Sequence, residues 1–234
     1  MTSVAERASQ VRDRIGAACR AAGRDPAEVR LMAVTKTHGL DVLEEAYGAG
    51  LRLFGENRVP EAAEKAEQLA DRPDLAWALI GHLQTNKVAR ALRFTTELHT
   101  LDSLKLAEAL DRRLQEQGRG LDVFVQVNTS GEEAKTGLAP DAVEAFALDL
   151  RPFTALRVRG LMTLAVYSDD EAAGAACFTR LTDLQQRLRQ LDAAPGSWDE
   201  LSMGMSGDFE LAIAHGATTV RVGQTLFGAR PPVG

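Results

Sequence analysis

The sequence predicts an α/β protein of the (β/α)8 TIM-barrel class, with an extra helix before the first strand. Short apolar runs alternate with helix-like segments along the chain, a pattern typical of parallel strands joined by helices. About eight such units follow one another, and a chain of 234 residues has the length at which such barrels are routinely one domain. We therefore expect residues 1–234 to form a single closed barrel rather than an open doubly wound sheet.

The first twenty-odd residues have the spacing of an amphipathic helix. The apolar positions of this pattern are Val4, Ala8, Val11, Ile15 and Cys19. Gly23 and Pro26 follow the last of them, and both residue types end helices. This helix precedes the first strand and is the expected addition to the barrel.

Each expected strand is a short apolar run that stops at a loop residue such as Gly, Asn, Ser or Thr. The expected strands are Leu31 to Lys36, Leu51 to Gly55, Trp77 to Gly81, Glu97 to Leu101, Asp122 to Asn128, Arg157 to Leu164, Glu200 to Gly204 and Thr218 to Gly223. Between them we expect helices from Asp41 to Gly48, Pro60 to Leu69, Thr85 to Leu92, Asp102 or Ser103 to Gly118, Pro140 to Leu150, a long helix to Asp192, and Asp208 to His215.

The composition, 45% apolar and 26% charged, is ordinary for a soluble globular protein. No apolar run approaches the ~18 residues that cross a bilayer, and residues 1–24 mix charges into their apolar positions, unlike a secretory signal. We expect a cytoplasmic protein that does not bind membranes. The net charge of −6, without a basic block, is not typical of a nucleic-acid-binding surface.

Neither the cysteines nor the histidines form a metal-binding pattern. Cys19 and Cys177 lie far apart in expected helices, without a Cys-x-x-Cys spacing or a histidine cluster. We therefore expect two reduced, packed thiols and no metal site. His99 and His215 are interpreted as fold residues, while His38 and His82 lie near the expected strand ends and are interpreted as solvated or structural groups.

The functional site of such a barrel lies at the carboxyl ends of the strands. The residues that follow the apolar runs are Lys36, Asn57, His82, Asn128, Thr163, Met203 to Ser206, and Arg221 to Gln224. Phosphate groups often bind at the loops after strands seven and eight of these barrels. The segments Ser202 to Asp208 and Arg221 to Gln224 occupy these two loops, where Gly207 and Gly223 would let backbone N–H groups approach an anion.

Lys36 adds an amine at the same rim. A lysine in a pocket of low dielectric constant loses its proton more easily than its free pKa of ~10.4 implies, and it can then form an imine with a carbonyl compound. A carbonyl compound that bears a phosphate would suit both the lysine and the two loops.

Six motifs, in order and at the expected strand ends, carry a resemblance to a known family. They are the Val-Thr-Lys that ends at Lys36, Phe-Gly-Glu-Asn from Phe54 to Asn57, Ile-Gly-His-Leu-Gln-x-Asn-Lys from Ile80 to Lys87, Gly-Leu-Met-Thr from Gly160 to Thr163, Leu-Ser-Met-Gly-Met-Ser-Gly-Asp from Leu201, and Val-Arg-Val-Gly from Val220. With these motifs the sequence resembles the pyridoxal phosphate homeostasis proteins, the YggS/PROSC family. The resemblance implies a fold like the barrel domain of bacterial alanine racemase, and pyridoxal 5′-phosphate (PLP) as the cofactor.

The resemblance also implies a set of cofactor-binding residues and no catalytic ones. Lys36 would form the imine (Schiff base), Asn57 would lie beside the cofactor ring, and Arg221 would face the pyridine nitrogen. The expected phosphate-binding residues are Ser206, Gly207, Gly223 and Gln224. Gln224 departs from the family pattern, which usually has a hydroxyl residue at this position, so a backbone contact is expected there rather than a side-chain contact.

Three functions are compatible with these residues. The first is a PLP carrier that holds, buffers and delivers the cofactor to PLP-dependent apo-enzymes with little or no turnover. The alternative is a PLP-dependent enzyme, an amino-acid racemase or decarboxylase, which needs a second acid or base on the opposite ring face. The third is an aldolase that uses a lysine imine without a cofactor, which leaves the arginine at the ring position unexplained.

We prefer the carrier and expect it to be a monomer. Lys135, in a Lys-Thr-Gly loop, is interpreted as a surface lysine that could also serve as a second amine site. Met203 and Met205 are interpreted as packing residues.

Overall fold

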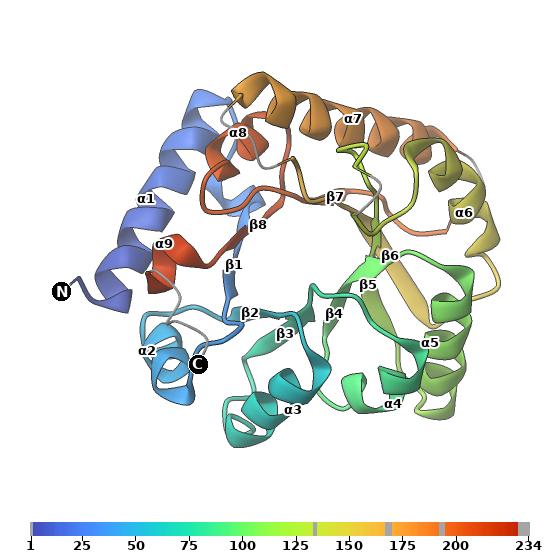
Figure 1. The fold of residues 1–234 in the computed structure, drawn as a ribbon, viewed down its shortest axis with the longest axis horizontal. Helices are drawn as coiled ribbons and strands as arrows, with labels where there is room; N and C mark the ends of the chain where they lie inside the picture. Colours follow the sequence, from blue (N-terminus) through green and yellow to red (C-terminus); the bar gives the residue numbers. More distant parts are fainter. Residues whose placement is uncertain (1, 133–134, 167–169, 192–194, 229–234) are drawn as a thin grey trace.

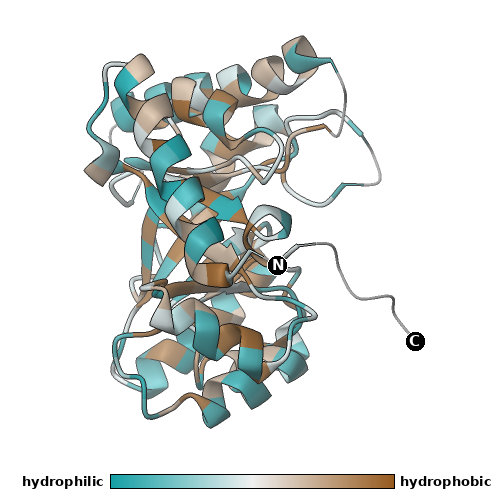
Figure 2. Ribbon diagram, turned by 90° about the vertical axis from the view of Figure 1, so that its left-hand side faces the viewer, coloured by the Kyte–Doolittle hydropathy of each residue, from teal (hydrophilic) through white to brown (hydrophobic). Residues whose placement is uncertain are grey.

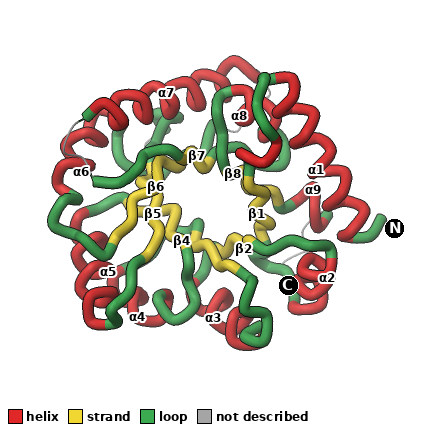
Figure 3. Tube along the Cα trace, turned by 180° about the vertical axis from the view of Figure 1, so that it is seen from behind, coloured by secondary structure: helices red, strands yellow, loops and turns green. Residues whose placement is uncertain are grey.

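The computed structural model of the chain is a closed barrel of parallel strands surrounded by helices (Figure 1), and it describes residues 2–132, 135–166, 170–191 and 195–228. The strand order is β1-β2-β3-β4-β5-β6-β7-β8, and β8 pairs with β1 to close the ring. From the opposite side, Figure 3 shows the ring of strands inside the ring of helices. The barrel of eight parallel strands predicted from the sequence is confirmed.

The strands are β1 Arg30–Val34, β2 Leu53–Glu56, β3 Ala76–Leu79, β4 Glu97–Leu101, β5 Leu121–Gln126, β6 Leu156–Met162, β7 Glu200–Ser202 and β8 Thr219–Val222. The α-helices are α1 Val4–Ala21, α2 Leu40–Gly48, α3 Val59–Gln68, α4 Val88–Ala91, α5 Leu104–Glu116, α6 Val143–Asp149, α7 Glu171–Gln190, α8 Phe209–Ala214 and α9 Gln224–Phe227. Short 3-10 helices are η1 Pro26–Glu28, η2 Thr85–Lys87 and η3 Pro140–Ala142.

Helix α1 is the expected addition before the first strand. Ser3 Oγ caps its first turn by accepting from the Glu6 N–H, and the Glu6 carboxylate accepts from the Ser3 N–H. Two otherwise unpaired backbone donors are therefore satisfied. The apolar positions that predicted the helix are all buried, and they pack it against α2, α8 and α9. Helix α1 therefore covers the part of the barrel where β8 meets β1.

The apolar residues form two separate cores. The larger one fills the layer between the strands and the helices, and Figure 2 shows apolar positions concentrated along the strands in the middle of the molecule. The smaller one lies inside the barrel and consists of Met32, Leu53 and Ala78, with Ala76 and Ile80 packed against it. It occupies only the β1–β3 side, which leaves space inside the barrel for polar side chains.

The cysteines and the element bounds agree with the sequence, whereas the last helix does not. Cys19 and Cys177 are free and buried, as expected for packed thiols, and the strand and helix bounds agree with the predicted ones to within a few residues. The four-residue helix α9 was not predicted, because a helix of that length has no apolar periodicity to detect. No helix in the described part of the chain is long and apolar enough to cross a membrane.

Candidate functional site

Lys36 and Asn57 lie at the same level of the barrel rim. In the β1–β2 ladder Val34 is paired with Gly55, and Lys36 and Asn57 each come two residues later, beyond the carboxyl ends of their strands. Both side chains are half-buried. Gly81 keeps the next loop against this position, because a Cβ there would lie 2.1 Å from the Asn57 carbonyl oxygen.

The two loops that were predicted to bind phosphate meet at Ser206. Its Oγ accepts hydrogen bonds from the backbone N–H groups of Gly223 and Thr225, each at 3.3 Å. A Cβ at Gly207 would meet no atom within 4 Å, so there is open space beside that backbone. The sequence placed Ser206, Gly207 and Gly223 at one rim, and the structure brings the two loops into direct contact.

The loop after β8 also contacts the strand that leads to Lys36. A Cβ at Gly223 would lie 3.3 Å from the carbonyl oxygen and from the Cβ of Val34, a tight contact that only a small shift of the loop or of β1 would relieve. Gln224 is exposed and is the first residue of α9. Because β8 pairs with β1, the amine-bearing strand and the loops that were predicted to bind phosphate are neighbours.

Arg221 is a buried cation inside the barrel. Only 3% of the residue is exposed. Its Nη1 donates to Ser202 Oγ at 2.8 Å, and its Nη2 donates to the Thr163 carbonyl oxygen at 2.6 Å. Burial lowers the pKa of Arg221 to about 10, with the charge of Asp208 acting in the opposite direction, so the guanidinium stays protonated at neutral pH.

In the described part of the chain, Arg221 forms no ion pair with a carboxylate. The ion pairs found there involve other cations, and Asp208 uses Oδ1 to accept from the Met205 N–H. The two hydrogen bonds of Arg221 go to neutral oxygens, while a guanidinium has five N–H donors. A buried charge without a carboxylate partner is costly, which makes this position suited to a ligand that accepts a hydrogen bond.

A chain of hydrogen bonds continues from Arg221 through the barrel interior. Ser202 Oγ lies 2.8 Å from His99 Nδ1, and His99 Nε2 lies 2.9 Å from Glu97 Oε2. Arginine only donates and a carboxylate only accepts, so Ser202 must direct its own proton to Nδ1, and the neutral ring must carry its proton on Nε2. Burial lowers the pKa of His99, in agreement with a neutral ring. The His99 ring also stacks on Phe124, with ring centroids 4.0 Å apart.

The interpretation of His99 as a fold residue missed this link to the predicted site. The sequence contained one signal for it, because Glu97 and His99 are two positions apart in a strand and therefore point to the same face. Nothing in the sequence indicated that this face is the barrel interior, or that Ser202 connects it to Arg221.

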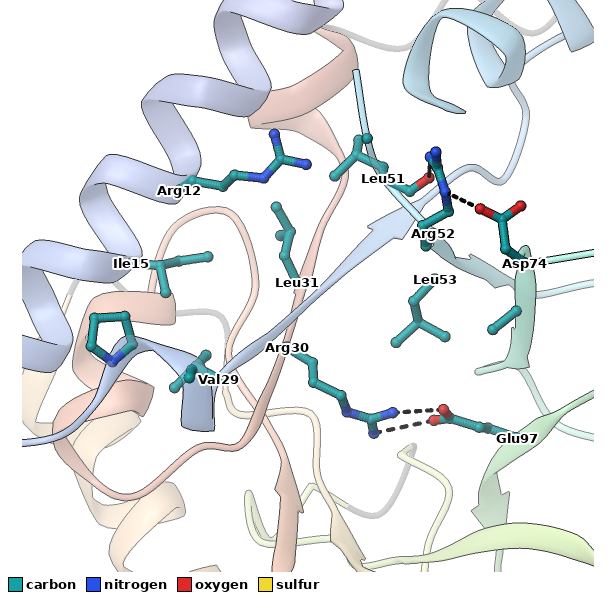
Figure 4. Close-up of a pocket in the computed structure, with 14 residues that line it drawn as sticks. Arg12, Ile15, Val29, Arg30, Leu31, Leu51, Arg52, Leu53, Asp74 and Glu97 are labelled. Atoms are coloured by element: carbon teal, nitrogen blue, oxygen red, sulfur yellow. Dashed lines mark hydrogen bonds and ion pairs between the residues drawn. The ribbon is translucent and has the colours of Figure 1, made fainter. Parts of the chain in front are cut away.

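The chain of hydrogen bonds that starts at Arg221 ends in an ion-pair cluster at the opposite end of the barrel. Glu97 accepts from Arg30 at 2.6 and 3.2 Å, and Arg30 also pairs with Glu200 at 2.9 Å. Arg30 and Glu97 line a cavity of about 620 Å³ at the amino ends of β1 to β4 (Figure 4). In barrels of this class the amino-terminal face contributes to stability and the carboxyl-terminal face to chemistry, so this cavity is not the predicted site.

The other candidates have separate local roles. Lys135 Nζ pairs with Glu132 at 2.7 Å and donates to the Ala165 carbonyl oxygen at 3.2 Å, so it is anchored rather than freely exposed. His82 lies 3.6 Å from Asp102. Met203 is fully buried in the main core, as expected for a packing residue. Within the described ranges, no group of three or more His, Cys, Asp or Glu residues is placed to hold a metal ion.

Comparisons with known proteins agree with the fold and with the motifs. The family model "Alanine racemase, N-terminal domain" matches residues 8–231. The pyridoxal phosphate homeostasis protein of Pseudomonas aeruginosa is 44% identical over 230 residues, which cover 98% of this chain and 97% of that protein. The protein of the same name from Aquifex aeolicus is 39% identical over 226 residues, with 96% and 97% covered.

A solved structure supports the same relationship. PipY of Synechococcus elongatus, determined with PLP bound, is 38% identical to this chain and superposes with a TM-score of 0.84, covering 96% of this chain and 100% of PipY. The identities extend over nearly the full length of both chains. The chain therefore belongs to the pyridoxal phosphate homeostasis protein family, whose barrel is that of the alanine racemase N-terminal domain.

Proposed function

We propose that this protein binds PLP at the carboxyl-terminal rim of the barrel and holds, buffers and delivers it, with little or no catalytic turnover. The observation that carries the proposal is the buried Arg221 guanidinium, which has no carboxylate partner in the described residues and lies on the strand that neighbours β1. A pyridine nitrogen is an uncharged acceptor that this guanidinium can pair with. The PLP-bound structure of the relative PipY supports the same cofactor.

The residues of the rim fit the cofactor. The Gly223 and Thr225 N–H groups converge on one point, now taken by Ser206 Oγ, and convergent backbone donors at a short loop are suited to a phosphate. Open space beside Gly207 leaves room for such a group. Lys36 and Asn57 come from the adjacent strand ends, so an amine and an amide would lie on the ring side of the site.

Each residue would then have a defined task. Lys36 would form the covalent link to the PLP aldehyde, in which a C–N bond forms and the carbonyl oxygen leaves as water. Asn57 would contact the ring, and Arg221 would donate to the ring nitrogen. Ser206 and the backbone of Gly207, Gly223 and Gln224 would hold the phosphate.

Bound PLP supplies an electron sink for reactions at the α-carbon of amino acids. Arg221 would weaken this sink, because a permanent donor beside the ring nitrogen disfavours a proton there. His99 keeps Ser202 oriented toward Arg221, so the guanidinium is held in one direction. These features favour a site that retains the cofactor over one that turns over a substrate.

The proposal also covers the domain organisation, the oligomeric state, the cellular location and the recipients of the cofactor. We propose that residues 1–234 act as one PLP-binding domain, as a monomer in the cytoplasm, with PLP-dependent apo-enzymes as recipients. Mixing the PLP-loaded protein with such an apo-enzyme and following recovery of its activity would test delivery, and sedimentation would test the monomer.

An absorption spectrum before and after borohydride tests the binding site itself. We expect a yellow protein whose band disappears on reduction, because borohydride reduces the C=N bond. Lys36→Ala should lose the band, whereas Lys135→Ala, the matched lysine on the same rim, should keep it. An unchanged reducible band in Lys36→Ala would show that the covalent link belongs to another lysine.

A further inference from the structure

Thr37, the residue after Lys36, has an unusual backbone conformation. Its φ angle is 68°, and only Trp198 shares a positive φ among the described non-glycine residues. For a β-branched residue this region is a genuine outlier. Such a conformation costs free energy and persists only where surrounding contacts hold it, often at a functional site.

One contact fixes Thr37 from outside the barrel. Its N–H donates to Glu61 Oε1 at 2.7 Å. Glu61 lies in the first turn of α3, and its side chain is 28% exposed. Burial raises the pKa of Glu61, but the hydrogen bonds from Lys65 and from the Thr37 N–H outweigh it, so the pKa lies below its ordinary value and the carboxylate is charged at neutral pH.

Lys65 connects this contact to Thr35, the residue before Lys36. Its Nζ donates to the Thr35 carbonyl oxygen at 2.9 Å, to Glu56 Oε1 at 2.7 Å and to Glu61 Oε1 at 2.7 Å. An ammonium has three N–H donors, and all three are used. Lys65 is 7% exposed, so it acts as a structural hydrogen-bond donor and is not accessible to form an imine with an aldehyde.

Glu56 completes a second contact to Thr35. Its Oε1 accepts from Thr35 Oγ1 at 2.7 Å as well as from Lys65, and the residue is 1% exposed. Burial raises the pKa of Glu56, which Lys65 counteracts. Its Oε2 has no hydrogen-bond partner among the described residues, so its pairing with Lys65 is the main compensation for a buried carboxylate.

We propose that Glu61 and Lys65 are positioning residues for Lys36, holding the peptide units on both sides of it so that its amine meets a bound aldehyde in a fixed direction. This inference rests on the proposed function, because it assigns Lys36 the covalent link. Glu56, Glu61 and Lys65, here called the carboxylate–lysine cluster, act through the backbone of Thr35 and Thr37. They carry out no chemistry on the cofactor.

A buried ion pair is by itself weak evidence of a contribution to stability, since apolar residues of similar size often serve as well. The contacts of the carboxylate–lysine cluster are directed at particular backbone positions, which a contribution to stability alone would not require. Three of its hydrogen bonds end on the two residues that flank Lys36, and one of these residues is strained. Holding a reacting group in place is worth large factors in rate, and small displacements remove much of that gain.

The test compares the rate of covalent linkage with binding that needs no linkage. Glu61→Ala removes the acceptor of the Thr37 N–H, Glu61→Gln keeps an acceptor oxygen, and Glu64→Ala on the same helix is an exposed control. Stopped-flow absorbance measures the rate at which PLP becomes linked to Lys36. Pyridoxine 5′-phosphate, which has an alcohol in place of the aldehyde, reports the integrity of the rest of the site.

We expect Glu61→Ala to slow linkage by roughly tenfold or more while its affinity for pyridoxine 5′-phosphate stays close to that of the unmodified protein. Glu61→Gln should recover most of the rate, and Glu64→Ala should match the unmodified protein. In the cofactor-free protein, hydrogen exchange at the Thr37 amide should become faster in Glu61→Ala only. That readout does not depend on PLP.

Two results would overturn the proposal: a linkage rate in Glu61→Ala equal to that of the unmodified protein, or a rate and an analogue affinity that fall together. If Glu61→Ala does not fold, the double variant Glu56→Gln with Lys65→Met tests the proposal instead. It removes both buried charges at once and should slow linkage in the same way. If the unmodified protein forms no link with PLP, the proposed function fails, and Thr37 amide exchange still shows whether the carboxylate–lysine cluster holds the backbone.

Discussion

Arg221 Nη1 donates to Ser202 Oγ at 2.8 Å, and the same oxygen lies 2.8 Å from His99 Nδ1. Glu97 can only accept, so the neutral His99 ring carries its proton on Nε2, and its Nδ1 accepts the proton of Ser202. His99 in turn donates from Nε2 to Glu97. A polar chain with a single direction therefore joins the ring position of the proposed cofactor site to the opposite end of the barrel.

Ser202→Ala should destabilise the protein, because it leaves a buried Arg221 donor and a buried His99 acceptor without their shared partner. Each buried polar group left unsatisfied costs about 1–3 kcal/mol. Urea unfolding measures the free energy of unfolding, and Ser197→Ala, at an exposed position, is the control. Equal losses in the two variants would contradict the role given to Ser202.

The ionisation of Glu97 should make the free energy of unfolding decrease at acid pH. Burial on its own raises the pKa of Glu97, but the hydrogen bonds from His99 and Arg30 and the charge of Arg30 outweigh it and lower the pKa from 4.5 to about 2. The folded-state pKa is below the unfolded one, so the stabilisation is fully present above 4.5 and is lost as the pH falls from 4.5 toward about 2. A shift of this size corresponds to about 3 kcal/mol at most.

Glu97→Gln removes this titration. The difference in free energy of unfolding between the unmodified protein and the variant should therefore shrink as the pH falls through that window, as measured by urea unfolding at a series of pH values. Glu116→Gln, at an exposed position, should show no such trend. Parallel pH profiles for the unmodified protein and Glu97→Gln would rule out Glu97 as the source.

Ser206→Ala should weaken the retention of PLP by about 1–2 kcal/mol, the scale of a hydrogen bond to a charged group. The physical reason is that Ser206 Oγ accepts from the Gly223 and Thr225 N–H groups, which hold the hydroxyl in place to donate its own proton to the phosphate. Equilibrium dialysis measures the change. Pyridoxal, which lacks the phosphate, should bind far more weakly than PLP, and equal affinity for the two aldehydes would remove the phosphate assignment.

The PLP-loaded protein should exchange the α-hydrogen of amino acids slowly, because Arg221 at the ring nitrogen leaves a poor electron sink. Incubation with individual L-amino acids in heavy water, followed by NMR, would detect deuterium at the α-carbon. The control is Lys36→Ala. Exchange at an enzyme-like rate that disappears in Lys36→Ala would support a racemase instead of a carrier.

The sequence by itself determined the fold class and the rim positions. Strand and helix alternation is a local property of the chain, since it follows from the spacing of apolar residues, and the residue after each apolar run is located at the same time. For this reason the sequence alone assigns Lys36, Ser206 and Arg221 to one end of the barrel. Their tasks came from the family resemblance.

Only the tertiary structure decided which of these residues touch. The contact of Ser206 with Gly223, the chain from Arg221 to Glu97, and the hold of Glu61 on Thr37 all join segments that are distant in sequence. Such contacts depend on strand register and on closure of the barrel by β8 and β1, which apolar spacing does not encode at the precision of a hydrogen bond. The polar side chains inside the barrel could not be predicted for the same reason. A strand buried on both faces is an apolar run in the sequence, and the run does not indicate which residues point into the barrel.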